Sequence, residues 1–264
     1  MSSKPLVDEM LASPSAAPAI ALLDQDRPLD NPEANVEVAS GDGKRRFSIY
    51  APAAAFDLAA ELDFLTRRAI DQNVFFAPQF LVPAMPRLGE RHVRLMVARD
   101  EGPRRSRLRF LMPFSIERIG MLGGPMAIRA WTHPFGPLGT PLVDSDDPQA
   151  TLTSLLVTLR RPELKLPDVL VIPDLRIDEP FARTMAEAVG ALGLPMTAVN
   201  AFDRAALIKG ASLTDALSPK RRREVQRQRR MLSAQGELGF DVARTPAEVL
   251  AAMEEFLTLE ASGW

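Results

Sequence analysis

Residues 218–230 hold the densest run of charge in the chain, with seven basic side chains and one acid. On a helix with about 100° per residue, four of these basic side chains fall within an arc of about 80°. They are Lys220, Arg223, Arg227 and Arg230, which we call the cationic ridge. Such a ridge can bind an anionic substrate or partner, and the other interpretation is a solvent-exposed helix face with no ligand.

A second candidate site combines one of the two histidines with aromatic neighbours. Residues 133–142 are rich in proline and glycine, which predicts an irregular loop of the kind that lines pockets. We expect Trp131, His133 and Phe135 to belong to such a pocket loop, the alternative being a histidine that only packs against aromatic rings. His92 is interpreted as structural.

The sequence lacks the residues or motifs that several other kinds of catalytic chemistry require. The chain has no cysteine, so disulfides, thiolate nucleophiles and zinc–thiolate sites are excluded, and two histidines argue against a histidine-rich metal site. No nucleophile elbow, Walker-type phosphate loop or dinucleotide fingerprint is found. Asp144 and Asp146 are interpreted as surface or capping groups, and Asp146 or Asp147 is expected to cap the helix that follows. The residues alone nominate no catalytic side chain.

Composition indicates a globular protein. The 264 residues are 46% hydrophobic and 25% charged, which suffices for one large or two ordinary domains. A formal net charge of -2 argues against extensive nucleic-acid binding. No stretch approaches the ~20 apolar residues of a membrane span, and no secretory signal is recognised, so we expect a cytoplasmic protein. Because cysteine is absent and histidine is scarce, we also expect no metal.

The elements that must position these residues follow from hydrophobic periodicity. Residues 1–43 are predicted to be a disordered acidic tail, because the first 40 residues hold seven acids and two bases. Strands are predicted at residues 46–50, 93–98, 107–116, 125–131, 167–173, 196–202 and 238–242. Helices are predicted at residues 53–69, 78–85, 147–159 and 179–192, from residue 218 onward, and at 245–259. The fold class is therefore α/β (or α+β), with a mixed, largely antiparallel sheet flanked by helices.

Capping residues mark the last two helices. Ser218 and Pro219 suit the start of the basic helix, in which Val225 and Leu232 form a thin apolar stripe expected to pack opposite the cationic ridge. The final helix starts with a capping-box sequence, residues 245–248, with proline at its first position. Its apolar side chains are expected to need a further sheet.

The order of elements from Phe47 to Phe202 resembles a Gcn5-related N-acetyltransferase (GNAT) fold: two helices, a central antiparallel hairpin and later strand–helix–strand units. Residues 217–232, 238–243 and 257–264 resemble the opening of the acetyltransferase domain in the cellulose-biosynthesis-associated (BcsL/CelD-like) group. That group resembles the Fem-type transferases, which carry two such folds in tandem. The resemblance implies a first GNAT-like domain at residues 44–209 and the start of a second, catalytic-type domain at 210–264. The chain is then expected to be an N-terminal fragment.

The same resemblance implies a reaction. The complete protein would be an acyl-coenzyme A-dependent N-acyltransferase, in which an amine acceptor attacks the thioester of acetyl-CoA or another acyl-CoA, helped by positioning and oxyanion stabilisation. GNAT proteins hold the coenzyme pyrophosphate on backbone amides of a Gln/Arg-x-x-Gly-x-Gly/Ala loop at a helix start. Here residues 135–141 stand in its place, so this copy is expected to lack cofactor-binding residues and the fragment to be inactive alone.

Two alternatives to acyl transfer from coenzyme A remain open. One is a Fem-like transfer of an aminoacyl group from charged tRNA, which the cationic ridge would suit. The other is a non-catalytic, pseudo-acetyltransferase binding module that presents residues 220–230 to an anionic partner. In the second case the chain would bind without catalysing any reaction.

Overall fold

The structure is a computed structural model that describes residues 34–40, 43–87, 93–100, 106–120, 123–204 and 217–263. The chain divides into two compact units, Met1–Thr197 and Ala198–Trp264. The predicted tail at residues 1–33 and the predicted structural residue His92 lie outside the described residues.

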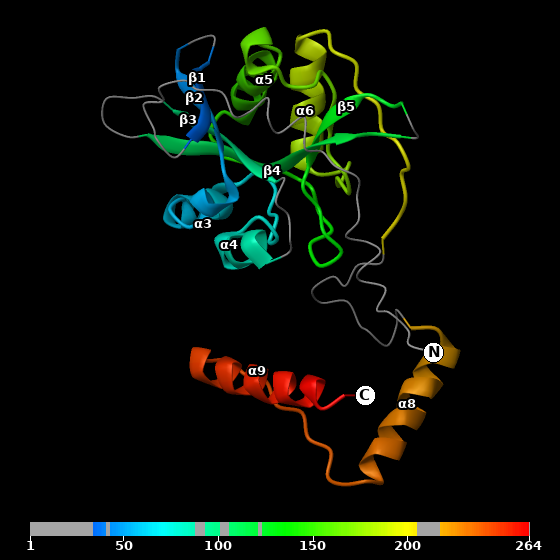
Figure 1. The fold of residues 1–264 in the computed structure, drawn as a ribbon. Coiled ribbons are helices and arrows are strands. Elements are labelled where there is room, and N and C mark those ends of the chain that lie inside the picture. Colours follow the sequence, from blue (N-terminus) through cyan, green and yellow to red (C-terminus); the bar gives the residue numbers. More distant parts are fainter. Residues whose placement is uncertain are drawn as a thin grey trace. The chain divides into compact units, whose positions relative to one another are not determined.

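The first unit is built on a seven-stranded, mostly antiparallel sheet (Figure 1). Its strands are β1 (Ala34–Ala39), β2 (Arg45–Tyr50), β3 (Arg94–Asp100), β4 (Arg107–Arg118), β5 (Met126–Ala130), β6 (Leu142–Val143) and β7 (Leu170–Val171). The sheet order is β1-β2-β3-β4-β5-β7, and the short β6 pairs with β4. Only the β5–β7 pair is parallel among the described strands. The expected mixed, largely antiparallel sheet is thus present.

Helices cover both faces of this sheet. Helices α3 (Ala59–Arg68) and α4 (Pro78–Arg87) lie on one face, while α5 (Pro148–Leu159) and α6 (Pro180–Ala191) lie on the other (Figure 1). Short 3-10 turns occur at Pro52–Ala55 and Pro162–Leu164. The antiparallel hairpin β3–β4 and the helices α4, α5 and α6 agree with the sequence prediction. The long helix predicted at residues 53–69 instead begins as a 3-10 turn before α3.

The central strand β4 contributes to both hydrophobic cores. Phe110 and Phe114 pack in the core that includes Leu152 and Phe181 of α5 and α6. Leu111 packs in the other core, with Leu62 of α3. Alternation of side chains between the two faces of a strand explains how one apolar segment serves two layers.

The prediction of a disordered tail up to residue 43 is wrong for residues 34–39, which form β1. This strand pairs along its length with β2. Its side chains Val36 and Val38 pack against the core, and Glu37 forms an ion pair with Arg46 at 2.6 Å. A short segment with two apolar residues is thus ordered by the free edge of β2, which a local count of charges does not register.

Three other predicted strands fail in whole or in part. The run at residues 167–173 forms only the two-residue, half-buried β7 at the sheet edge. Residues 196–202 and 238–242 are irregular, and Val199, Phe202 and Phe240 are exposed. A strand needs a neighbouring strand to bond its backbone, and the described residues provide none for these two segments.

The second unit contains helices α8 (Pro219–Ser233) and α9 (Pro246–Ala261). Ser218 caps α8 by accepting a hydrogen bond from the Arg221 N–H, and Thr245 and Glu248 form the predicted capping box of α9. Val225 and Leu232, the stripe expected to pack, are exposed within this unit, whose described residues do not cover them. Among the described residues, no helix is long and apolar enough to cross a membrane.

Candidate functional site

The first feature is the segment from Asp144 to Asp147, which follows residues 135–141 and leads into α5, the first helix after them. The Asp144 N–H donates to the carbonyl of Arg109 at 2.9 Å, and the Ser145 N–H donates to that of Arg68 at 2.9 Å. The Asp146 N–H donates to Oδ1 of Asp144 at 2.8 Å. Three successive amides therefore already have acceptors within the protein.

Two features at the start of α5 disfavour a bound anion. Its first residue is Pro148, which has no N–H. Asp147 occupies the N-cap position with φ of 55°, in the left-handed region, and its side chain does not cap the helix. The prediction that an aspartate side chain caps this helix is therefore wrong for Asp147. Its carboxylate instead faces Arg45, with 3.6 Å between Oδ2 and the guanidinium Nη2.

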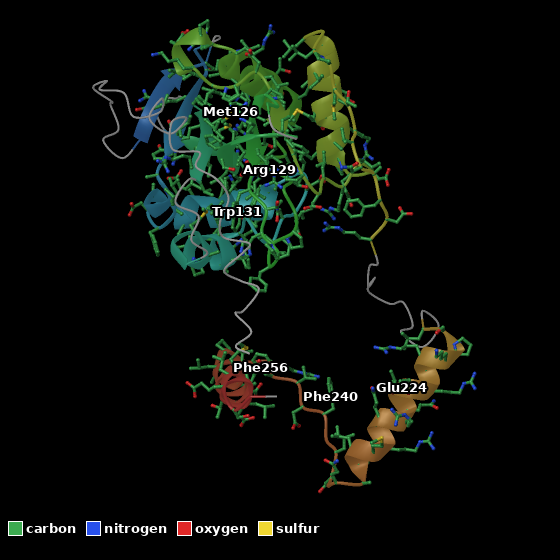
Figure 2. All side chains as sticks on the ribbon, turned by 45° about the vertical axis from the view of Figure 1, so that its right-hand side comes forward. Met126, Arg129, Trp131, Glu224, Phe240 and Phe256 are labelled. Atoms are coloured by element: carbon green, nitrogen blue, oxygen red, sulfur yellow. The ribbon has the colours of Figure 1, made fainter. Side chains whose placement is uncertain are left out.

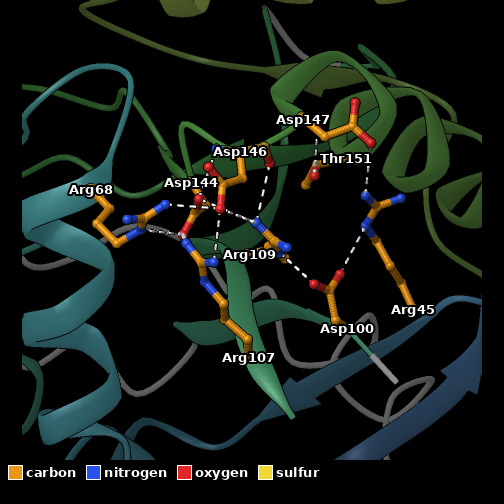
Figure 3. A network of polar contacts seen from close by, with 9 residues as sticks. All are labelled: Arg45, Arg68, Asp100, Arg107, Arg109, Asp144, Asp146, Asp147 and Thr151. Carbon is orange, nitrogen blue, oxygen red and sulfur yellow. Dashed lines mark hydrogen bonds and ion pairs between the residues drawn. The ribbon is translucent and has the colours of Figure 1, made fainter. Parts of the chain in front are cut away.

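Eight charged side chains surround this segment and form an arginine–aspartate network (Figure 3). The members are Arg45, Arg68, Arg107, Arg109, Asp100, Asp144, Asp146 and Asp147. They come from β2, the end of α3, β3, β4 and the segment before α5. Four formal positive charges face four formal negative charges, so the network is balanced and ties these elements together.

Asp144 is the centre of the network. Its side chain is 0% exposed and contacts three guanidinium groups: Arg107 at 2.5 Å, Arg109 at 3.3 Å and Arg68 at 3.4 Å. The side chain of Asp146 contacts the same three arginines but is 53% exposed. The hydrogen bond from Arg107 holds the pKa of Asp146 below its usual value. The interpretation of Asp144 as a surface group is therefore wrong, because it is buried and contacts arginines of α3 and β4. Its Oδ1 also accepts the N–H of Asp146, which is a local capping bond.

The three rings of the predicted pocket loop pack against one another in sequence order. The ring centroids of Trp131 and His133 are 6.2 Å apart, and those of His133 and Phe135 are 5.2 Å apart. Trp131 is buried and also stacks on Phe76, whereas Phe135 is exposed. The His133 Nδ1 accepts the N–H of Phe135 at 3.2 Å, which fixes the imidazole in a local turn. The structure thus brings the three residues together by packing.

The rest of this loop is clamped by buried hydrogen bonds. The Asn73 side chain donates to the carbonyls of Leu138 and Thr140 at 2.9 and 2.8 Å. The Gly139 N–H donates to the carbonyl of Pro173 at 3.2 Å, and a Cβ on Gly139 would lie 2.5 Å from that oxygen. Glycine is therefore required for this close approach.

Beside this clamp lies a cavity of about 470 Å³. Its lining residues are Ile70, Asp71, Gln72, Val74, Leu138, Arg176 and Glu179. Asp71 is 4% exposed, and its Oδ2 accepts the N–H of Phe181 at 3.0 Å in the first turn of α6. Burial raises the pKa of this carboxyl. Sequence reasoning missed Asp71, because one aspartate after a predicted helix carries no recognisable signal.

The cationic ridge lies on α8, whose basic side chains project around the labelled Glu224 in Figure 2. All four of its residues are exposed, but Arg227 pairs with Glu224 at 2.8 Å. Nε of Arg223 and of Arg230 donates to helix carbonyls four residues earlier. The helix thus presents the ridge to solvent, as both interpretations of it require.

Neither a metal site nor a known relative points to further functional residues. Among the residues that the structure describes, no group of three or more His, Cys, Asp and Glu side chains could hold a metal ion. Comparison with protein-family models, curated proteins and solved structures found no match.

Proposed function

We propose that residues Met1–Thr197 are a GNAT-like domain that does not hold coenzyme A and that supports an acyl-coenzyme A-dependent N-acyltransferase as its non-catalytic domain. The order of elements supports the GNAT-like interpretation. After β2 come two helices, then the antiparallel strands β3, β4 and β5, and then α5, β7 and α6. This order supports the two helices, the antiparallel hairpin and one strand–helix–strand unit of the resemblance, β5–α5–β7. The strand that the resemblance places after α6 is not found among the described residues.

The proposal rests on the segment before α5, in which three successive backbone amides already donate to oxygens of the protein. A phosphate bound at a helix start needs free backbone N–H groups and a positive local field. Here the amides of Asp144, Ser145 and Asp146 donate to protein oxygens, and Pro148 has no N–H. Three carboxylates in the same segment would repel a pyrophosphate, and the nearby arginines are already paired with them.

Acyl transfer in this proposal belongs to a second domain of the same fold, whose opening the residues from Leu217 onward resemble. Its co-substrates would be acetyl-CoA or another acyl-CoA and an amine acceptor. The amine would attack the thioester carbonyl, and the thiolate of the coenzyme would leave. The first unit would then contribute surface and stability but no reacting group.

The exposed cationic ridge favours a second candidate function. In this function the chain binds an anionic partner through α8 without catalysis, or binds charged tRNA as the donor of an aminoacyl group. The supporting observation is that all four ridge residues lie on one exposed helix, where Arg227 alone of the four is in an ion pair among the described residues, whereas all the arginines of the first unit's network are paired. Exposed, clustered cations attract polyanions in a salt-dependent way.

Isothermal titration calorimetry of the chain with acetyl-CoA tests the coenzyme part of the proposal. We expect no saturable binding that survives moderate salt. The phosphates of coenzyme A could also bind α8 by charge alone, so the control is a variant with the four ridge residues changed to Gln, and ATP serves as a control ligand. Binding of acetyl-CoA that persists in this variant and that ATP does not compete would overturn the proposal.

A further inference from the structure

The cavity beside Asp71 has the size and wall composition of a small-molecule site. Its volume of about 470 Å³ lies within the range of ~300–1,000 Å³ that ligand pockets occupy. Three chain segments line it: residues 70–74 between α3 and α4, Leu138 from the clamped loop, and Arg176 with Glu179 just before α6. The clamp on Asn73 and Gly139 holds two of these segments in place.

The charged side chains that line the cavity differ in whether they form an ion pair. Arg176 contacts Glu179, with 3.4 Å between Nη1 and Oε1, and donates to the carbonyl of Gln72 at 3.3 Å. The only positive side chain of the lining is therefore engaged with its own neighbours. Among the described residues Asp71 makes one hydrogen bond, to the Phe181 N–H, and no ion pair. Burial raises the pKa of Asp71 by more than the charges of Arg176 and Arg183 lower it, and neither arginine forms an ion pair with it among the described residues. One buried carboxyl is therefore left without an ion-paired cation.

A buried carboxylate without a partner cation costs free energy, which a cation in the cavity would offset. Consistent with that cost, burial is the main cause that raises the pKa of Asp71. The apolar side chains of Ile70, Val74 and Leu138 complete the lining and suit hydrocarbon. A ligand that matches these walls carries one positive group and an apolar body.

We propose that this cavity binds a small organic cation, with its ammonium or guanidinium group at Asp71 and its alkyl or aryl body against Ile70, Val74 and Leu138. An anion would have to compete with Glu179 for Arg176. The inference concerns binding alone, and it stands whether or not the chain takes part in acyl transfer.

The test is a titration of the isotope-labelled chain with n-butylammonium, followed by two-dimensional NMR. n-Butanol and sodium butyrate serve as probes of the same length without charge and with the opposite charge. We expect saturable shifts of the amides of Asp71, Gln72 and Val74 with the ammonium probe alone. Nuclear Overhauser contacts between the probe and the Val74 and Ile70 methyl groups should locate it without any variant.

Asp71→Asn separates ligand binding from the structural role of the carboxyl. Asparagine keeps an oxygen acceptor for the Phe181 N–H but loses the charge, so affinity for n-butylammonium should fall at least about tenfold. Asp178→Asn is the matched control, because this exposed residue lies one position before Glu179 and does not line the cavity. Equal affinity in the Asp71→Asn variant, tighter binding of butyrate, or absence of probe contacts to Val74 and Ile70 would overturn the proposal.

Discussion

Asp144 and Asp146 form a natural matched pair for measuring the role of the arginine–aspartate network. Both carboxylates contact Arg68, Arg107 and Arg109, but the Asp144 side chain is fully buried and that of Asp146 is half exposed. Replacing each with alanine removes contacts to the same three guanidinium groups. The difference between the two variants therefore reports the effect of burial.

The cost of Asp144→Ala follows from these contacts. Removing one partner of a buried ion pair typically costs ~3–5 kcal/mol, because the remaining charge is left unpaired. Here the three arginines are 15–34% exposed and keep Asp146 as a partner, so part of that cost is recovered by water and by the second carboxylate. We expect the free energy of unfolding to fall by about 2–3 kcal/mol. Asp146→Ala should cost clearly less, since its carboxylate is already hydrated.

Urea unfolding at pH 7 measures both values. Trp131 is buried in the first unit and serves as the fluorescent probe, with Trp264→Phe as the background because the chain has two tryptophans. Asp144→Asn is a useful intermediate, since it keeps an acceptor for the Asp146 N–H and removes only the charge. The reasoning fails if Asp144→Ala is no more destabilising than Asp146→Ala.

Three further predictions concern the loop, the cavity and α8. Gly139→Ala places a Cβ 2.5 Å from the Pro173 carbonyl and should cost about 1–3 kcal/mol in urea unfolding, whereas Gly190→Ala, with open space around it, should be neutral or stabilising. Burial raises the pKa of Asp71 in the folded state. The protonated carboxyl therefore contributes fully to folding stability below the unfolded-state pKa, and this contribution is lost as pH rises through the folded-state pKa. Asp71→Asn should therefore gain stability relative to the parent as pH rises from 3 to 7 in thermal melts, and an unchanged difference would contradict this. Changing the cationic ridge to Gln should weaken binding to heparin and flatten its salt dependence with an unaltered melting temperature; an equal affinity and salt slope would assign the ridge to solvent.

Local signals in the sequence located most of the helices and their starts. Ser218 and Thr245 cap their helices as predicted, because a cap involves residues three positions apart and is readable from the sequence itself. The β3–β4 hairpin follows for the same reason, since one polar turn joins two periodic runs. These elements can be predicted without knowledge of the rest of the fold.

What the sequence could not predict depends on contacts between distant segments. β1 is ordered by the edge of β2, and the two-residue β6 exists because it pairs with β4. Asp144 is buried by arginines 35 to 76 positions away, and Asp71 meets the Phe181 amide 110 positions later. Neither aspartate differs from a surface aspartate in its local sequence, so only the assembled sheet assigns their roles.

The arginine–aspartate network and Asp71 differ in whether their carboxylates are in ion pairs. This difference indicates which of the two is the better site for a charged ligand. In the arginine–aspartate network every carboxylate has a guanidinium partner, so an added anion or cation would have to break an existing pair. At Asp71 a cation would instead relieve an existing cost, since the carboxyl is buried and Arg176 is paired with Glu179. Paired charges at the start of α5 therefore disfavour a coenzyme there, whereas the carboxyl of Asp71, which has no ion pair among the described residues, favours a small cation in the cavity before α6. Ligand chemistry in this unit should concentrate at Asp71, while Asp144 holds the fold.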